Sequence, residues 1–417
     1  MELVCTACGK KRNPEHLFPM SCDCGGLLEV RHDFRLADAK RLKALFDARL
    51  ALRTGPYASG VWRYKELIDP GLDEAHIVTR GEGNTGLYDC EPAARHAGVR
   101  RVWLKAQGEN PSGSFKDNGM TAAVSRGVAA GCRTVACAST GNTSSSLAMY
   151  AAWAGLRCVV LVPSGGVASG KLAQTIAHGA EVYALEGGYD AGVRLLNRYG
   201  ASLGLYVCNS VNPFRIEGQK SMIIEAAHQL GWSLPDWVVL PGGALSNASA
   251  VGKGLLEMKA IGLIDRVPRI AVVQAEGASP FHRMIASGGE TLVPEQAPRT
   301  AASAIRIGNP PSWRKAARVL RETNGVTCAV SDEAILDAKR VIDRAGIGCE
   351  PAAAAGLAGL KKLVEDGVIG RDETALVVLT GHLLKDPAAI RPLEAGAEPL
   401  TAEALLARLA TRTPAQA

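Results

Sequence analysis

The sequence predicts an α/β protein with parallel sheets, and three observations lead to this prediction. Short runs rich in β-branched residues alternate with longer helical segments from about residue 100 onward. Most of these runs are apolar throughout, as in strands that helices cover on both faces. The chain has 417 residues, more than one compact core holds, since a domain contains about 100–200 residues. We therefore expect at least two domains.

Eight strands are expected from the apolar runs. They are RVWLKA (101–106), TVACAS (134–139), CVVLVP (158–163), EVYALE (181–186), LYVCNS (205–210), WVVLPG (237–242), RIAVVQAE (269–276) and ALVVLTG (375–381). The helical segments between them include 168–178, 189–203, 216–230 and 247–262. The tail from 396, EPLTAEALLARLATRTPAQA, is predicted to form one amphipathic helix with a frayed end.

Composition indicates an ordinary cytosolic protein. Hydrophobic residues make up 47% and charged residues 21%, and no apolar stretch is long enough to cross a bilayer. The N-terminus, MELVCTACGK, lacks the apolar core of a signal peptide. The net charge of +6 is spread along the chain, so nucleic-acid binding has little support. An anionic substrate and a plain solvated surface are both compatible with this charge.

The first thirty residues carry two close pairs of cysteines, Cys5 with Cys8 and Cys22 with Cys24. Four thiolates on turns can hold a structural Zn²⁺ in tetrahedral geometry. The second pair is separated by one residue rather than two, which departs from the usual spacing. Two interpretations therefore stay open: a zinc ribbon, and a ribbon-shaped element without metal. The other cysteines are expected to be mostly free thiols.

Four segments at strand ends carry polar residues, where α/β sheets collect their ligands. The first is NPSGSFKDNG (110–119), which places Lys116 at the start of a helix. A partly desolvated amine there can lose its proton and form a Schiff base with an aldehyde cofactor. A lone lysine is weak support for such a role, because most lysines are solvated surface residues.

The other three segments also follow strands. ASTGNTSSS (138–146) offers backbone N–H groups and hydroxyls at a helix N-terminus, where a carboxylate or phosphate can bind. LPGGALSNAS (240–249) has a glycine pair that lets the backbone approach a phosphate. LTGHLLKDP (379–387) puts the hydroxyl of Thr380 at the edge of the sheet. Taken singly, these motifs are equally compatible with helix capping, a strand–helix turn and a buried threonine.

Together the motifs resemble threonine synthases, a family of fold-type II pyridoxal-phosphate enzymes with a fold like that of the tryptophan synthase β subunit. The resemblance rests on SFKD, ASTGNTS, NSVNPFRIEGQKS, PGGALSN, ASAIRIGNP and LTGHLLKD. It extends from VWRYKELI (61–68) to Asp386, and the start ending in CGGLLEV also resembles bacterial members. The combination is far more specific than any one motif.

The resemblance implies a cofactor site for pyridoxal 5'-phosphate. Lys116 would hold the cofactor as a Schiff base and move protons. Asn142 would bond the ring hydroxyl, and Thr380 would face the pyridine nitrogen and leave it largely unprotonated. The cofactor phosphate would lie on the turn formed by Gly243, Ala244, Leu245, Ser246 and Asn247.

The implied substrate is O-phospho-L-homoserine, which reacts with water to give L-threonine and phosphate by γ-elimination and β-addition of water. Its α-carboxylate and neighbouring groups would contact Ser139, Thr140 and Thr143. Its phosphate would contact Asn209, Ser210 and Arg215 in NSVNPFR. Arginine suits this task because its planar fork donates to two phosphate oxygens.

The chain departs from the family in the glycine loop, where Ala244 and Ser246 replace the usual asparagine and glycine. Backbone donors survive, but a side-chain amide near the substrate is lost, so other substrates stay open. The alternatives are cysteate synthase, acting on O-phosphoserine and sulfite, threonine or serine ammonia-lyase, and a catalytically silent binding protein. The NSVNPFR segment favours a phosphorylated substrate, and Lys116, Asn142 and Thr380 argue against a silent protein.

The resemblance also implies two parallel-sheet domains with the cofactor in the cleft between them. The expected division is a zinc-ribbon-like element (1–30), a large cofactor domain (31–117 and 214–395), a small inserted domain (118–213) and a C-terminal helix and tail (396–417). Closure of the small domain would exclude water until it is needed. We also expect a homodimer, with no membrane or nucleic-acid partner.

Overall fold

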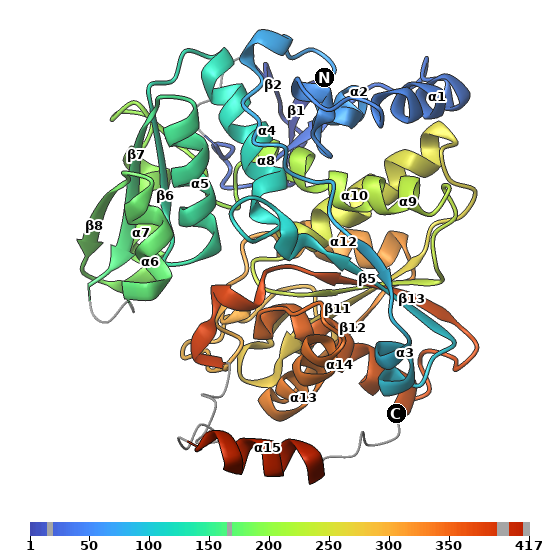
Figure 1. The fold of residues 1–417 in the computed structure, drawn as a ribbon. Helices are drawn as coiled ribbons and strands as arrows, with labels where there is room; N and C mark the ends of the chain where they lie inside the picture. The colour runs from blue at the N-terminus through green and yellow to red at the C-terminus, as the bar shows by residue number, and fades with distance from the viewer. Residues whose placement is uncertain (15–19, 165–168, 390–399, 412–417) are drawn as a thin grey trace.

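The computed structural model describes residues 1–14, 20–164, 169–389 and 400–411, whose strands form three sheets (Figure 1). A six-stranded sheet has the order β12-β11-β10-β13-β5-β4, and a four-stranded sheet has the order β8-β7-β6-β9. A three-stranded sheet at the N-terminus has the order β2-β1-β3. In the part of the chain that the structure describes, no helix is both long and apolar enough to cross a membrane.

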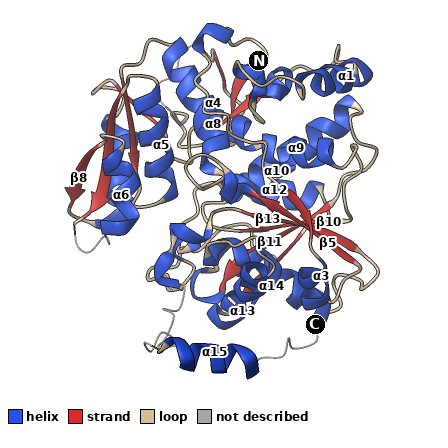
Figure 2. Ribbon diagram, in the orientation of Figure 1, coloured by secondary structure: helices blue, strands red, loops and turns tan. Residues whose placement is uncertain are grey.

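The six-stranded sheet is parallel except for β4, which runs antiparallel to β5. Its strands are β4 (Leu87–Asp89), β5 (Arg101–Ala106), β10 (Trp237–Pro241), β11 (Arg269–Ala275), β12 (Val326–Val330) and β13 (Thr374–Leu379). Helices pack on both of its faces (Figure 2). One layer includes α9 (Ser221–Gln229), α10 (Ser246–Ile261) and α12 (Trp313–Glu322), and the other α3 (Glu91–Ala97), α13 (Asp332–Arg344) and α14 (Pro351–Glu365).

Burial on both faces explains why the strands of this sheet are apolar throughout. Val238 and Leu240 of β10 pack in the same core as residues of α10, whereas Val239 packs on the other face with residues of α14. Small residues let α14 approach the sheet closely. A Cβ added at Gly356 would lie 2.9 Å from Cγ1 of Val377, so a larger side chain would push the helix away.

The four-stranded sheet is parallel and stands to one side of the larger sheet (Figure 1). Its strands are β6 (Thr134–Ala138), β7 (Arg157–Pro163), β8 (Glu181–Leu185) and β9 (Leu205–Val207). The helices around it are α5 (Asn142–Trp153), α6 (Ser169–Ala177) and α7 (Gly188–Tyr199). Helix α4 (Lys116–Ala129) packs against both α5 and α8 (Pro213–Gln219), and so joins this unit to the rest of the chain.

The N-terminal sheet is antiparallel and consists of β1 (Glu2–Cys5), β2 (Lys11–Arg12) and β3 (Leu28–Arg31). Buried charged side chains attach it to the helices behind it. Lys253 of α10 donates to the carbonyl oxygen of Val30 at 2.6 Å. The Nε2 atom of His32 lies 2.7 Å from a carboxylate oxygen of Glu217 on α8. The cysteine-bearing segment is therefore anchored to the helix that carries Arg215.

All eight predicted strands are present, with ends that differ by at most three residues. The sequence pattern did not predict β4, which is short, or β12, which is only partly buried, and both lie at edges of the sheet. The helical segment expected over 216–230 is present but divided, because α8 ends at Gln219 and α9 begins at Ser221. The hydroxyl of Ser221 donates to the carbonyl oxygen of Gly218, which competes with the helical hydrogen bonds there.

The remaining helices are α1 (Ala39–Arg49), α2 (Lys65–Ile68), α11 (Pro280–Ala286) and α15 (Ala402–Thr411). Helix α15 lies within the tail that was expected to be helical from 396. Residues 396–399 and 412–417 of that prediction, and residue 168 of the predicted helix 168–178, lie outside the described residues. The expected domain limits stay a prediction, although all four strands of the smaller sheet fall between 118 and 213.

Candidate active site

A cavity of about 1180 Å³ lies where the carboxyl ends of β5, β10 and β13 face the N-terminal end of α5 and the middle of α6. All four motif segments contribute to its wall. The sequence-predicted residues that line it are Lys116, Ser139, Thr140, Asn142, Thr143, Asn209, Ser210, Gly243, Ala244, Ser246, Asn247 and Thr380. Leu245 and Arg215 are not part of the lining. The folding of the chain thus brings together segments from four separate stretches of the sequence.

Lys116 is the first residue of α4, as its position after the Gly/Pro turn predicted. Its ammonium lies 4.0 Å from the centroid of the Phe115 ring. Burial and, to a smaller extent, the charge of Arg215 lower the pKa of Lys116 to about 7, and the charge of Glu350 opposes them. A large fraction of this amine is therefore unprotonated near neutral pH, as attack on an aldehyde requires.

Asn142 begins α5 and faces a carboxylate that comes from α14, far along the chain. Its Nδ2 atom lies 3.1 and 3.2 Å from the two carboxylate oxygens of Glu350. Glu350 is buried, and burial raises its pKa while the bond from Asn142 opposes the rise. This contact fixes the plane of the Asn142 amide in the wall of the cavity, because the side chain can no longer rotate freely.

The turn between β10 and α10 has the form of an anion cradle. A Cβ at Gly242 would lie 2.7 Å from Cγ1 of Val272, so only glycine fits there. Leu245 has φ +65°, in the left-handed region, directly before the helix. A left-handed residue next to helical ones turns successive backbone N–H groups toward one point. Asn247 closes the turn by donating to the carbonyl oxygen of Pro241 at 2.7 Å, so the site fits a phosphate.

The segments expected to bind the substrate line the same cavity as this turn. The hydroxyl of Ser139 accepts a hydrogen bond from the backbone N–H of Gly141 at 3.2 Å. The Asn209 amide donates to the carbonyl oxygen of Ala138 at 2.9 Å and accepts from its N–H at 3.0 Å. Asn209 therefore holds the end of β6 in place, and the neighbouring Ser210 is half-buried in the lining.

Arg215 lies behind the wall of the cavity, with only 1% of its surface exposed. Its Nη1 atom donates to the carbonyl oxygen of Cys208 at 3.0 Å, which supports the segment that continues to Asn209 and Ser210. Its positive charge also contributes to the low pKa of Lys116. The guanidinium thus supports the segment expected to receive the substrate phosphate and also acts through its charge on the reactive amine.

The cavity also contains charged and polar side chains that sequence reasoning missed: Gln174, Arg306, Glu350 and Lys385. Arg306 and Lys385 stand in ASAIRIGNP and LTGHLLKDP, so the motifs themselves were a signal that they lie near the site. Gln174 lies on α6 and Glu350 directly before α14, in segments whose sequence shows no such signal.

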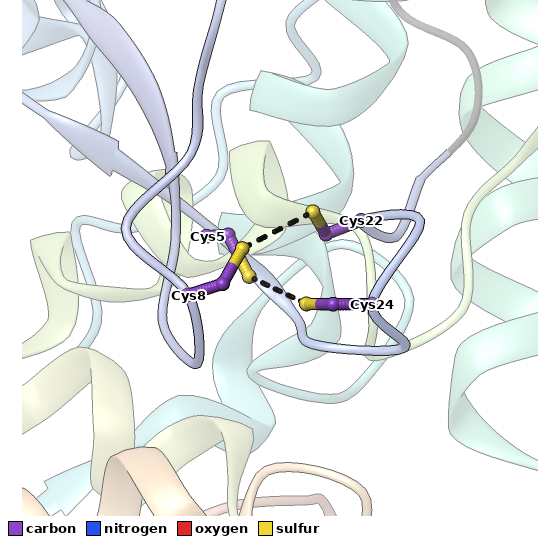
Figure 3. A group of neighbouring side chains, drawn as sticks. All are labelled: Cys5, Cys8, Cys22 and Cys24. Carbon is purple, nitrogen blue, oxygen red and sulfur yellow. Dashed lines mark hydrogen bonds between the residues drawn. The ribbon is translucent and has the colours of Figure 1, made fainter.

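The four N-terminal cysteines converge in space, and their sulfur atoms all lie within 4.8 Å of one another (Figure 3). The Sγ atoms of Cys5 and Cys24 are 3.4 Å apart, and those of Cys8 and Cys22 are 3.7 Å apart. Four sulfurs at about 2.3 Å from one zinc ion would be separated by about 3.8 Å. The arrangement therefore fits a tetrahedral metal despite the shorter spacing of the second pair.

Comparison with known proteins agrees with the motifs. The family described as pyridoxal-phosphate dependent enzyme matches residues 78–381. Threonine synthase of Methanosarcina acetivorans is 43% identical over 388 residues, which cover 92% of this chain and 92% of that protein. Threonine synthase of Methanocaldococcus jannaschii is 42% identical over 401 residues, 96% of each chain.

Solved structures give the same fold. The crystal structure of threonine synthase from Escherichia coli matches with a TM-score of 0.74 and 20% identity, over 97% of this chain and 94% of that chain. Maize serine racemase matches with a TM-score of 0.62 and 19% identity, over 78% of this chain and 94% of that chain. These matches confirm the predicted fold-type II class and the pyridoxal phosphate cofactor. The chain belongs to the pyridoxal-phosphate dependent enzymes and, within them, to the threonine synthase family.

Proposed function

We propose that the chain converts O-phospho-L-homoserine and water to L-threonine and phosphate. Its membership of the threonine synthase family makes it a pyridoxal-phosphate dependent lyase with a small-molecule substrate. One observation carries the choice of substrate: a single cavity joins the amine of Lys116, the N-terminus of α5 and Ser210, beside the buried Arg215. This arrangement supports a substrate with a carboxylate at one end and a phosphate at the other.

The residues proposed to hold the cofactor surround Lys116. When bound, pyridoxal 5'-phosphate supplies an electron sink for the carbon next to the amino group. The N–H groups of the turn from Gly243 to Asn247 would take its phosphate, and Asn142 would bond its ring hydroxyl. Thr380, which is buried directly after β13, would present a neutral hydroxyl to the pyridine nitrogen.

The chain's own residues are proposed to move protons and stabilise the leaving phosphate. Lys116 Nζ takes the proton from Cα of the substrate, then one from Cβ, and returns one to Cγ after phosphate has left. Ser210 and Arg215, with Asn209 holding the segment, stabilise the phosphate dianion as the Cγ–O bond breaks. Ser139, Thr140 and Thr143 hold the carboxylate. Water then adds at Cβ, loses a proton and forms the new C–O bond of threonine. One proton returns from Lys116 Nζ to Cα, and the remaining one leaves with the phosphate as HPO₄²⁻.

Cofactor capture by the apoenzyme is expected to depend on pH through Lys116. Because its pKa is lowered to about 7, the reactive neutral amine increases as pH rises through 7. The rate at which the absorption band of the bound cofactor appears after mixing should therefore rise between pH 6 and 8 and level off above, over about two units around 7. A rate that keeps rising toward pH 10 would mean that the amine has an ordinary pKa.

The cysteine cluster is proposed to hold a structural Zn²⁺ that is dispensable for the chemistry. Metal analysis should show about one zinc per chain. Removal of the metal with a chelator should lower the melting temperature and leave the specific activity of the folded fraction unchanged, because the cysteines lie outside the cavity. A metal-free preparation with an unchanged melting temperature would favour the ribbon without metal.

Product analysis tests the proposed substrate against its rivals. O-phospho-L-homoserine should yield equal amounts of phosphate and L-threonine. O-phosphoserine with sulfite should release little phosphate, and L-threonine or L-serine should yield little ammonia. If O-phosphoserine is used in preference, the chain is a cysteate synthase. We further propose that the enzyme works as a homodimer in the cytosol, as the resemblance implies.

A further inference from the structure

Lys385 reaches into the active-site cavity from the segment after β13, five residues beyond Thr380. Its ammonium donates to three acceptors: the carbonyl oxygen of Ser112 at 3.0 Å, Oγ of Ser145 at 3.0 Å and Oε1 of Gln174 at 2.6 Å. A lysine ammonium has three N–H groups, so this arrangement uses all of them. The side chain is therefore held at a defined point, unlike a solvated lysine.

The three acceptors belong to different structural elements. Ser112 belongs to the loop that leads into Lys116, whereas Ser145 and Gln174 lie on α5 and α6 beside the four-stranded sheet. Lys385 itself follows the last strand of the six-stranded sheet. One side chain thus connects the segment after β13, the loop before the reactive lysine, and helices α5 and α6.

The residues around Lys385 leave room for its side chain and reinforce its contacts. A Cβ at Gly113 would lie 3.1 Å from Cδ of Lys385, so glycine leaves the room that the side chain needs. Asp117 accepts from the N–H of Ser112 at 2.7 Å and from the hydroxyl of Ser146 on α5 at 2.5 Å. Burial lowers the pKa of Lys385, and the charges of Glu350 and Asp117 oppose this effect. An acidic and a basic side chain therefore both tie the loop to α5.

We propose that Lys385 is a positioning residue that holds α5 and α6 over the substrate and so retains the reacting molecule until water adds at Cβ. The inference rests on the proposed function. Loss of phosphate from O-phosphohomoserine leaves a four-carbon unsaturated amino acid. Addition of water at its Cβ gives threonine. If the cavity opens first, this unsaturated amino acid, which is an enamine, leaves the enzyme. It then reacts with one water molecule and gives 2-oxobutyrate and ammonia, without oxidation or reduction.

The test is the partition between these two products in the holoenzyme. Lys385→Met keeps the length of the side chain and removes all three donors. We expect 2-oxobutyrate per phosphate released to rise about tenfold and KM for O-phosphohomoserine to rise about tenfold, as loss of one charge-assisted bond would cause. The absorption band of the bound cofactor should stay unchanged. Lys385→Arg should restore part of the threonine yield, since it keeps the charge and the donors.

Two further variants make the result decisive. Gln174→Ala removes only the contact with α6 and should shift the partition in the same direction by a smaller factor. Lys339→Met is a matched control, because Lys339 is a buried lysine of α13 paired with Asp343 outside the cavity. Its product ratio should equal that of the wild type.

An unchanged product ratio and KM in Lys385→Met would overturn the proposal. If that variant fails to fold, unchanged values in Gln174→Ala would overturn it instead. A wild-type enzyme that releases no phosphate from O-phosphohomoserine would refute the proposed function rather than the role of Lys385. The two failures are therefore distinguishable.

Discussion

Lys116→Ala is expected to lower the rate of threonine formation by at least about 10³-fold, within the range that a positioned acid–base group contributes. The amine lies in the wall of the cavity, and its pKa of about 7 suits both proton transfer and attack on the cofactor. The methyl side chain of alanine can neither transfer a proton nor attack the cofactor. Phosphate release and the visible spectrum are the measurements, and added small primary amines should restore a small part of the activity.

The matched control for this variant is Lys362→Ala, because Lys362 is a half-exposed lysine on α14 that lies outside the cavity lining. It should retain full activity. Borohydride reduction of the wild-type holoenzyme followed by peptide mapping should place the pyridoxyl group on the peptide that contains Lys116. Labelling of any other lysine would end the assignment.

Arg215→Ala is expected to lower kcat/KM for O-phosphohomoserine by a factor of roughly 30 to several thousand. Truncating one partner of a desolvated charge pair costs about 2–5 kcal/mol, and each 1.4 kcal/mol is about tenfold. The guanidinium also donates a hydrogen bond to the carbonyl oxygen of Cys208, and its charge contributes to the low pKa of Lys116. Its removal takes away a positive charge, so the pKa of Lys116 should rise and the pH midpoint of cofactor capture should move upward.

Loss of a buried arginine can also destabilise the fold, so the comparison needs a second arginine. Arg49 is buried as well and pairs with Glu66 at 2.6 Å, on the N-terminal helix α1 and outside the cavity lining. Arg49→Ala should lower the melting temperature without changing kcat/KM. Full activity in Arg215→Ala would remove this arginine from the proposed phosphate site, and substrate recognition would then have to lie elsewhere in the cavity.

Much of the fold could be predicted because local patterns determine it. Continuous apolar runs such as β10 reflect burial on both faces of a sheet, and the turn before Lys116 indicates where a helix begins. The break between α8 and α9 could not be predicted from periodicity, because the competing hydrogen bond from the Ser221 hydroxyl to the Gly218 carbonyl leaves the apolar pattern unchanged. Edge strands such as β12 bury only part of their surface, so their pattern is weak.

The residues of the candidate site that lie within the sequence motifs could be predicted, whereas contacts between segments far apart in the sequence could not. Glu350 meets Asn142 across 208 residues of sequence, and this contact exists only because the fold places the N-terminal ends of α14 and α5 opposite each other. The position of Arg215 behind the wall depends in the same way on how α8 packs against α4. The left-handed backbone conformation of Leu245 could not be predicted from the residue type, because leucine rarely adopts this conformation.

The central claim is that the Cγ–O bond of the substrate breaks and that solvent water supplies the new hydroxyl at Cβ. Turnover of O-phosphohomoserine in ¹⁸O-labelled water, followed by mass spectrometry of both products, tests it directly. The account predicts one ¹⁸O in threonine, on Cβ, and phosphate that retains all of its original oxygens. Unlabelled homoserine together with ¹⁸O-labelled phosphate would instead show cleavage of the P–O bond, and this result would contradict the account.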